Sequence, residues 1–406
     1  TTGASNTALG RSSLAANTTA SNNTAVGYHS LLANTTGTSN VALGALALDA
    51  NTTGDQNVGV GKNAIGTNTT GDANTAIGHG ALAVATTASN NTAVGFHSLV
   101  ANTTGPNNVA VGATSLQANT TGSNQTAVGH GVLLANTTGY RNTAIGAAAM
   151  AANTTGIYNT AIGFTALDAN TTANSNTSMG YASMTTNTTG GTNVAVGAYA
   201  LTANTTASNN TAVGYDSLKA NTTGGGNTAF GSAAGNSITT SVNNTCIGTN
   251  ADSNGTTGNG NISIGNNAQK STVTSAGQCT LGDSAITNLR CNDTSISSLS
   301  DSRDKTNIVD IPLGLNFLNT VRPVSFDWDR RDGSMVGKKD FGFIAQELKT
   351  AADATVYADH MRLVQDDNPN KLEADPMKMF PILVKAIQEL SAQNAALTAR
   401  IETLEG

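Results

Sequence analysis

The sequence predicts a mainly β fold: a parallel β-solenoid or β-roll shaft built from a seventeen-residue repeat, then a small α+β domain that ends in a coiled coil. Three observations predict it. An apolar residue followed by Gly recurs every seventeen residues from Leu9-Gly10 to Leu281-Gly282, in seventeen copies without insertion or deletion. The composition changes abruptly near residue 283, and apolar residues at heptad spacing run through the last thirty residues. A fixed period this short is typical of stacked solenoid turns.

Charged residues divide the chain into two regions. Residues 1–282 hold five Lys/Arg and six Asp/Glu, which leaves fourteen and nineteen for the remainder. We expect a shaft over 1–282, a linker over 283–299, a compact domain over 300–376 and a C-terminal helix with a coiled coil over 377–406. The first region is polar and low in complexity, as disordered tracts are. Its apolar positions nevertheless keep strict phase, and disorder imposes no such register.

Each turn offers two short apolar segments. In the second copy, residues 23–27 read Asn-Thr-Ala-Val-Gly, and residues 30–33 read Ser-Leu-Leu-Ala. We expect both segments to form strands, with Gly letting the backbone turn and Thr-Thr-Gly closing the turn. At roughly 4.8 Å per turn, the shaft would be a rod of about 80 Å.

The thin core of one turn predicts a homotrimer. Each turn carries about two large apolar side chains, too few to seal a core by itself. Three parallel chains around one axis would merge their apolar faces. The words Asn-Thr-Ala-Val-Gly and Asn-Thr-Ala-Ile-Gly resemble the repeats of trimeric autotransporter adhesin heads and of bacteriophage tail-fibre shafts.

Asn precedes the expected strand in fifteen of the seventeen copies, with Gln125 and Gln278 in the other two. One interpretation is a ladder of stacked side-chain amides, and the other is a turn residue chosen for local backbone bonding. Replacement by Gln, a poor turn former, favours the ladder. The repeated Asn-Thr-Thr words match the glycosylation sequon, but a repeat multiplies any accidental match, so we interpret them as turn chemistry.

The residue after the repeat Gly is variable and often aromatic or His. One interpretation is a variable surface column, and the other is a binding surface for sugars. No two adjacent turns carry His at the same repeat position. The cysteines show neither metal-ligand nor disulfide spacing. We predict no metal and no cofactor, and we expect Cys246 and Cys279 to be buried, unreactive thiols.

Composition argues against two classes of partner. The net charge of −6 provides no basic surface, so nucleic-acid binding is not expected. No run of about eighteen apolar residues exists, so no membrane insertion by a helix is expected. Residues 1–6 read as the tail of a turn whose beginning is missing, so we expect a further N-terminal part.

Beyond residue 299 the sequence reads Ser-Asp-Ser-Arg-Asp-Lys-Thr-Asn-Ile, later Val-Arg-Pro-Val-Ser-Phe-Asp-Trp, and then Phe-Gly-Phe-Ile-Ala-Gln-Glu-Leu. These words, over roughly residues 297–406, resemble the endosialidase-type intramolecular chaperone domain found at the C-terminal end of phage tail fibres and tailspikes. Phe326, Trp328 and the segment around Ile344 are expected to form its small core.

The resemblance implies a self-cleaving dyad of Ser300 and Lys305, with the scissile bond between Leu299 and Ser300. A serine hydroxyl needs a base, which a lysine with a lowered pKa supplies. Arg303 would favour that lowering, and its acidic neighbours would oppose it. Glu347, in the Gly-Phe-Ile-Ala-Gln-Glu word, either assists cleavage or forms a structural salt bridge. Without the resemblance, the segment would read as a polar loop with Ser300 as a cap.

The C-terminal residues carry an apolar seam at spacings of three and four, the signature of a coiled coil. A single Asn in such a seam commonly sets register and strand number. Near Pro381 the alternative is a helix that packs on its own domain. The seam comprises Phe380, Leu383, Ile387, Leu390, Asn394, Leu397, Ile401 and Leu404.

Together these features predict a structural, homotrimeric phage tail fibre in the virion, attached through its missing N-terminal part and binding a host cell-surface glycan or protein receptor. Near-identical turns let chains slip by one turn, so the chaperone would set the trimer register. The alternative is a trimeric adhesin head on a bacterial cell surface. A glycan-cleaving shaft is not expected, because residues 1–282 contain no Glu and only six scattered Asp.

Overall fold

The structure is a computed structural model that describes residues 2–283, 286, 300–330, 335–368, 370 and 372–405. The chain divides into two compact units, Thr1–Asp283 and Ser284–Gly406. Each unit is described by itself. Most of the predicted linker lies outside the described residues.

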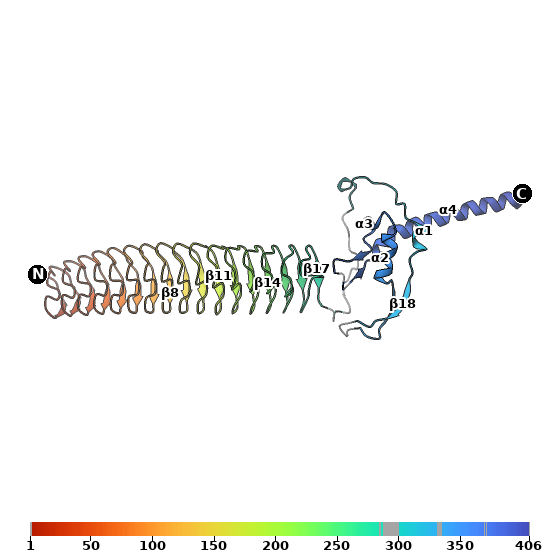
Figure 1. Ribbon diagram of the computed structural model, residues 1–406. Coiled ribbons are helices and arrows are strands. Elements are labelled where there is room, and N and C mark those ends of the chain that lie inside the picture. The colour runs from red at the N-terminus through yellow and green to blue at the C-terminus, as the bar shows by residue number, and fades with distance from the viewer. Residues whose placement is uncertain are drawn as a thin grey trace. The chain divides into compact units, whose positions relative to one another are not determined.

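The first unit is a parallel β-solenoid, as predicted (Figure 1). Each strand is three residues long and pairs in parallel with the strand one repeat later, so that Thr24 lies opposite Val41 and Ala25 opposite Ala42. The strands are β1 (Thr7–Leu9), β2 (Thr24–Val26), β3 (Val41–Leu43), β4 (Val58–Val60), β5 (Thr75–Ile77), β6 (Thr92–Val94), β7 (Val109–Val111), β8 (Thr126–Val128), β9 (Thr143–Ile145), β10 (Thr160–Ile162), β11 (Thr177–Met179), β12 (Val194–Val196), β13 (Thr211–Val213), β14 (Thr228–Phe230), β15 (Thr245–Ile247), β16 (Ile262–Ile264) and β17 (Cys279–Leu281).

The prediction of a second strand in each turn is wrong. The segment 30–33 is a series of turns, because His29 and Leu31 adopt the left-handed conformation with φ of 57° and 47°, which an extended strand excludes. Its backbone still bonds between turns. The Leu31 N–H donates to the Ala47 carbonyl at 3.0 Å, and the His29 N–H donates to the Arg11 carbonyl at 3.0 Å. Stacking thus satisfies the backbone without a second sheet.

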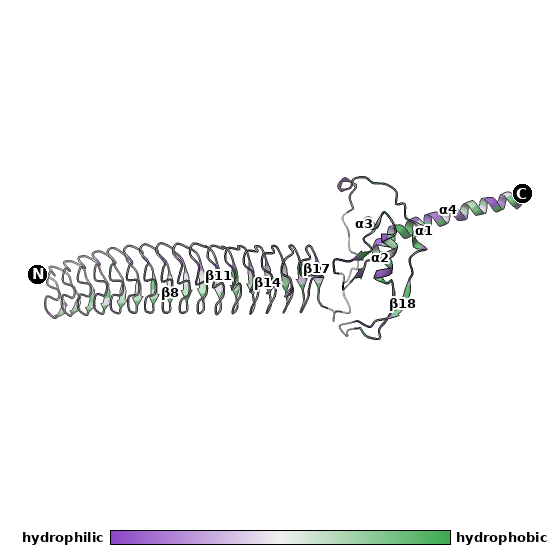
Figure 2. Cartoon of the chain, viewed as in Figure 1, coloured by the Kyte–Doolittle hydropathy of each residue, from purple (hydrophilic) through white to green (hydrophobic). Residues whose placement is uncertain are grey.

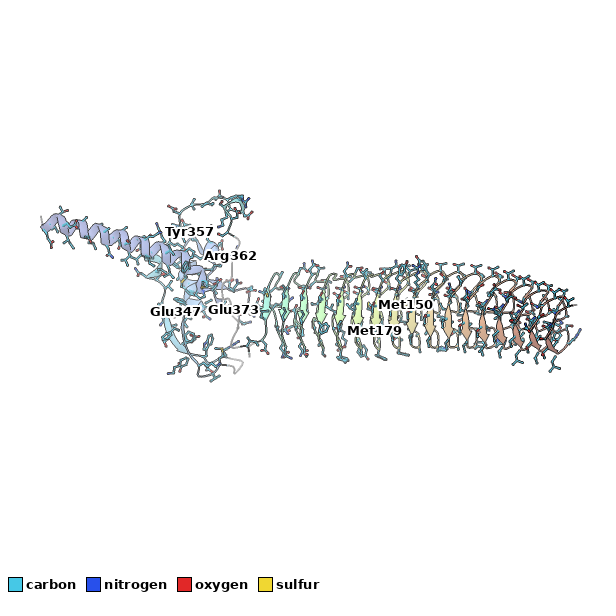
Figure 3. All side chains as sticks on the ribbon, turned by 180° about the vertical axis from the view of Figure 1, so that it is seen from behind. Met150, Met179, Glu347, Tyr357, Arg362 and Glu373 are labelled. Atoms are coloured by element: carbon cyan, nitrogen blue, oxygen red, sulfur yellow. The ribbon has the colours of Figure 1, made fainter. Side chains whose placement is uncertain are left out.

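The core is closed within a single chain, against the expectation that one turn cannot seal it. The middle strand residue, such as Ala25, and the Leu six positions later, such as Leu31, are both 0% exposed. Met150 and Met179, labelled in Figure 3, mark the difference between columns, since Met150 in the Leu column is 0% exposed and Met179 at a strand end is 39% exposed. Small Ala residues and one Leu per turn therefore suffice.

The third residue of every strand faces away from this core and is nowhere buried. We call this row the outer stripe; Figure 2 shows green, hydrophobic colour on strands of the shaft. It comprises Leu9, Val26, Leu43, Val60, Ile77, Val94, Val111, Val128, Ile145, Ile162, Met179, Val196, Val213, Phe230, Ile247, Ile264 and Leu281.

The Asn that precedes each strand forms the predicted ladder. The Oδ1 of Asn23 accepts the backbone N–H of Asn40 at 2.9 Å, and the Nδ2 of Asn40 donates to the Gly54 carbonyl at 2.8 Å. The side chains are buried. The column thus stacks as predicted, but its bonds run chiefly to backbone groups of the neighbouring turns. Amide-to-amide bonds join only some turns, as from the Nδ2 of Asn74 to the Oδ1 of Asn57 at 3.1 Å.

The Asn of the Asn-Thr-Thr word forms a second buried column, the inner Asn column. The Nδ2 of Asn51 donates to the Oδ1 of Asn34 at 2.9 Å and also to the Gly54 carbonyl at 3.0 Å. These residues make the turn bond that we predicted and, in addition, a side-chain amide ladder that we did not predict. Ala85 interrupts this column and is buried in the same place.

The second unit contains short helices, three-residue and four-residue 3₁₀ turns, and two small antiparallel sheets. Its core includes Phe317, Leu348, Leu363 and Ile382. Ile344 precedes the helix that carries Leu348. The elements are η1 (Ser302–Asp304), α1 (Leu315–Leu318), β18 (Val324–Asp327), β19 (Lys339–Gly342), α2 (Ala345–Asp353), α3 (Ala358–Met361), β20 (Val364–Gln365), β21 (Glu373–Ala374), η2 (Pro376–Met379) and α4 (Phe380–Glu405).

Two expectations about buried side chains are wrong. Phe326 and Trp328 lie half-buried outside this core and pack edge to face on each other, with ring centroids 5.1 Å apart. Cys246 is buried as expected, but Cys279 is exposed, because it is the first residue of the last strand and not a middle one. Among the described residues no helix is both long and apolar enough to cross a bilayer.

The Gly after each strand stacks directly on its equivalent in the next turn. Gly61 has a φ of +124°, and a Cβ built there would lie 2.7 Å from the carbonyl oxygen and 2.8 Å from the carbonyl carbon of Gly78. Those atoms are backbone, so they cannot move aside without separating the turns. The positive φ also disfavours any side chain.

We predict that Gly61→Ala destabilises the turns around it, whereas Gly66→Ala does not. A Cβ at Gly66 meets no atom closer than 3.6 Å, which is ordinary contact. Hydrogen exchange of the backbone amides on the neighbouring turns should become about thirtyfold faster in Gly61→Ala, for a loss of about 2 kcal/mol. Equal protection in the two variants would contradict the steric argument.

Candidate functional site

The segment that links Ser300 to Lys305 folds back on itself. Asp301 caps the 3₁₀ turn η1 by accepting the backbone N–H of Arg303 at 2.9 Å, and the Lys305 N–H donates to the Ser302 carbonyl at 3.2 Å. One tight turn between the two residues therefore returns the lysine side chain to the serine.

Ser300 and Lys305 are in direct contact. The Nζ of Lys305 lies 2.6 Å from the Oγ of Ser300 and 3.4 Å from its carbonyl oxygen. A lysine amine at this distance can take the hydroxyl proton once it is neutral, which is the arrangement of an activated nucleophile. Both residues are exposed, so water also reaches the site. Leu299 lies outside the described residues.

Arg303 is held by Asp301 and not by the dyad. Its Nε lies 3.1 Å from each carboxylate oxygen of Asp301, and its Nη2 lies 2.5 Å from Oδ2. These hydrogen bonds lower the pKa of Asp301. The guanidinium charge is therefore balanced locally, which weakens the predicted influence of Arg303 on Lys305.

Glu347 forms a salt bridge, the second of the two roles considered for it. It lies in the first turn of α2 and binds Arg322, with Nε 3.0 Å from Oε2 and Nη2 in contact with Oε1. The hydrogen bonds from Arg322 lower the pKa of Glu347. No hydrogen bond or ion pair joins Glu347 to Ser300 or Lys305, all three of which the structure describes.

One comparison finds a family that matches the segment containing these residues. Residues 300–357 match the model of the family described as chaperone of endosialidase, so the match begins at Ser300 and includes Lys305 and Glu347. A repeat shaft followed by this domain points to a protein of the phage tail-fibre or tailspike type. No curated protein and no solved structure matches the chain significantly.

Helix α4 presents two faces. Ile382 and Ala386 are buried on their own domain, which fits the alternative considered near Pro381. The predicted seam faces away and is exposed over its whole length; Figure 2 shows hydrophobic and hydrophilic residues alternating along this helix. The exposed fractions are 66% for Ile387, 47% for Leu390, 57% for Leu397 and 52% for Ile401, and Asn394 is also exposed.

The aromatic residues of the shaft stack mainly on one another. The rings of Phe164 and Tyr181 are nearly parallel, with centroids 5.7 Å apart. Tyr199 lies edge to face with Tyr181, and Lys219 covers its ring at 5.4 Å. Faces used in this way are not free to stack on sugar rings, although ring edges and hydroxyls remain exposed. Sugar stacking is therefore less favoured here than the sequence alone allows.

Among the described residues, neither the surface hollow of the second unit nor the metal-ligating residue types provide a second candidate site. A surface hollow of about 430 Å³ is lined by Lys349, Asp353, Asp366 and neighbouring residues. Lys349 already pairs there with Asp366 at 2.8 Å and with Asp353 at 3.4 Å. Within the described ranges, no group of three or more His, Cys, Asp or Glu is placed to hold a metal.

Sequence reasoning missed one positioning contact. Glu389 of α4 accepts the backbone N–H of Leu315 at 2.8 Å and thereby caps α1. Gly314 leaves the space for it, because a Cβ there would clash with the Glu389 carboxylate. The Gly before the apolar start of α1 was the available sequence signal for a helix start. It could not identify Glu389 as the capping group, because Glu389 is 74 residues from Leu315 in the sequence.

We predict that Glu347→Gln leaves self-cleavage within about threefold of the unmodified rate and changes acid stability instead. The folded pKa of Glu347 is lowered, so its stabilising contribution is present above the unfolded value of about 4.3 and is lost as pH falls through the folded pKa. Fluorescence of the single Trp reports melting of this unit alone.

Melting should therefore depend less on pH below about 5 in Glu347→Gln than in the unmodified chain. Both proteins would carry Ser300→Ala in the melting experiment, so that the chain stays intact. Loss of cleavage in Glu347→Gln with unchanged acid melting would instead place Glu347 in the cleavage machinery.

Proposed function

We propose that this chain is the shaft and chaperone of a homotrimeric phage tail fibre, and that the chaperone sets the trimer register and then cuts itself free. The observation that carries the self-cleavage is the 2.6 Å contact between Ser300 Oγ and Lys305 Nζ at the start of the matched domain.

The chemistry follows from that contact. Neutral Lys305 takes the proton of the Ser300 hydroxyl, and Oγ attacks the carbonyl carbon of Leu299, the preceding residue. A C–O ester bond forms, the C–N bond between Leu299 and Ser300 breaks, and the amine of Ser300 takes a proton. Water then hydrolyses the ester, so that Leu299 becomes a carboxyl terminus and Ser300 a free N-terminus.

The outer stripe supports the association of shafts. A single chain closes its own core, so the stripe contributes nothing inside the chain. It nevertheless places an apolar residue in the same row at every turn, with Leu43 49%, Phe230 58% and Leu281 51% exposed. A continuous apolar row of this kind marks an interaction surface. A second copy in parallel has the same spacing and presents apolar residues to apolar residues along the whole row.

Helix α4 supports the association of chains at the C-terminal end as well. Its seam is exposed, whereas its other face packs on its own domain, so the seam is left for partner helices. Asn394 in that seam would restrict the register of the helices.

The two parts solve one assembly problem together. Near-identical turns allow parallel shafts to slip by a whole turn at little cost, so the shaft alone cannot select its register. A C-terminal coil that aligns three chains would start assembly in register. Cleavage afterwards would remove the assembly template and leave the shaft kinetically trapped.

The remaining partners follow from the predicted role. The N-terminal side would attach to the rest of the virion, and the shaft surface would contact a host glycan or protein receptor. A trimeric bacterial surface adhesin is the alternative. The repeat suits either protein, but the chaperone match favours the fibre.

We predict that the unmodified chain yields two fragments that separate between Leu299 and Ser300, and that Ser300→Ala and Lys305→Met each yield one intact chain. Mass spectrometry under denaturing conditions measures this directly. Ser302→Ala, two residues from the nucleophile, is the matched control and should still cleave. An intact unmodified chain after assembly would sink the self-cleavage proposal.

We predict that a Ser300→Ala chain has the native mass of three copies, and that Leu397→Lys raises the concentration needed for trimer formation about tenfold or more, because the charge enters the seam. Ala399→Lys adds the same charge two residues later, outside the seam, and should leave the trimer unchanged. A native mass of one chain for Ser300→Ala would contradict the trimer.

A further inference from the structure

The last turns of the shaft depart from the core pattern. The buried Leu column continues to Leu218 and then reads Gly235, Asp252 and Gln269. Asp252 thus occupies a position that Leu fills elsewhere, and it is 0% exposed. Lys270, one turn later, is also buried, at 7% exposed. A carboxylate thus replaces an apolar side chain in the Leu column, and an amine from the next turn is buried as well.

The two groups face each other across adjacent turns. The Nζ of Lys270 lies 3.6 Å from the Oδ2 of Asp252, and the exposed fractions of their side chains are 2% and 0%. The amine donates a hydrogen bond to the Thr257 carbonyl at 2.9 Å. Neither carboxylate oxygen of Asp252 has a hydrogen-bond partner. The pair is therefore in contact, enclosed and incompletely satisfied.

Gly255 makes room for this contact. It stands at the position of the inner Asn column, and a Cβ there would lie 2.7 Å from both Cε and Nζ of Lys270. The end of the lysine side chain fills the space that an Asn side chain fills in earlier turns. Asp252, Gly255 and Lys270 thus form one fitted set.

An ionic form of this pair is costly. Burial penalises both charges, and a carboxylate without hydrogen bonds loses most of its solvation. Burial raises the pKa of Asp252, and the charge of Lys270 offsets this only in part. The buried Cys246 thiol nearby has its pKa raised to about 12, first by burial and then by Asp252, so it stays protonated. Transfer of one proton from Lys270 to Asp252 gives a neutral acid beside a neutral amine.

We propose that Asp252 and Lys270 condense into an amide bond that joins these two turns covalently. The nitrogen lone pair of Lys270 attacks Cγ of the protonated Asp252 carboxyl and forms a C–N bond. The C–O bond to the hydroxyl breaks, the hydroxyl takes one proton from the nitrogen, and one water molecule leaves. No oxidant, reductant or further reactant is needed.

The close contact between the carboxyl and the amine promotes the condensation. Effective concentrations reach about 10⁵–10⁸ M for well-oriented groups that are held in contact. The reacting atoms are enclosed, so the Thr257 carbonyl can hold the amine while water is kept from reversing the reaction. The product is one neutral amide that cannot return to the ionic pair by proton transfer, and its N–H keeps Thr257 as an acceptor.

The amide bond would stabilise the C-terminal turns of the shaft. It lies in the turns that precede residue 283, where the Leu and inner Asn columns have ended and the solenoid has its last strand. A covalent link between residues 252 and 270 restricts unfolding of these turns in the same way as a disulfide restricts a loop. The C-terminal end of the repeat core would thus be fastened.

The test is the mass and the tryptic map of the full Ser300→Ala chain. Condensation makes the chain lighter by one water. It also blocks trypsin after Lys270, so that residues 220–290 appear as one peptide, without fragment ions between 252 and 270. Lys270→Arg cannot condense, because its guanidinium stays charged. Its digest should give residues 220–270 and 271–290 at full mass.

Asp252→Leu restores the residue of the earlier turns and provides a second control that should fold. It should be cut fully after Lys270 and retain its full mass. A native chain cut completely after Lys270 overturns the proposal. If that chain is also lighter by one water, the loss reflects a cyclic imide elsewhere. A mass loss that persists in Asp252→Leu overturns it as well.

Discussion

The stacking of identical turns is the constraint on which the shaft depends. Each buried position repeats one turn later, so a core side chain packs on the equivalent residue of the next turn, which in most turns is the same or a similar residue. Ala25 and Leu31 show how little apolar volume is then needed, because each is fully buried without help from another chain. The same constraint explains the repeat Gly, whose equivalents approach more closely than a Cβ permits. An insertion of one residue would displace every column at once, which is why the period has none.

The period made the solenoid predictable, but the path of each turn was not. Sequence reasoning expected a strand at 30–33. The expectation failed because Leu31 adopts the left-handed conformation, and nothing about a Leu in the sequence indicates that conformation. The Leu that looked like a second strand is the main core residue, and the aliphatic residue of the first strand lies on the surface. Each turn has two apolar positions, and both recur every seventeen residues. The repeat pattern alone therefore cannot show which of the two faces the core. The inner Asn column was not predicted, because the Asn-Thr-Thr sequence is equally compatible with a turn and with a buried amide ladder.

In the second unit, the family resemblance implied the dyad, whereas the ion pairs were not predictable. Ser300 and Lys305 are five residues apart, so a single turn is enough to bring them together. Glu347 meets Arg322 across 25 residues, and Arg303 meets its near neighbour Asp301. Arg303 was considered as a helper of cleavage because its charge would favour a lower lysine pKa, and Glu347 because it lies in a segment that resembles the family. Their ion pairs depend on how the chain folds, and spacing along the sequence does not show it.

The uniform stacking that builds the shaft also limits it. Identical columns contain nothing that tells one turn from another, so information about position must enter where the columns change. Both the Leu column and the inner Asn column end toward the C-terminal end, where Asp252 and Gly255 replace the repeated residues and Lys270 is buried beside them. Beyond it the chain changes to the domain that holds the dyad and the α4 seam. The end that would be aligned first is thus also the end whose core is chemically distinct, and a bond formed there would remain after the chaperone had left.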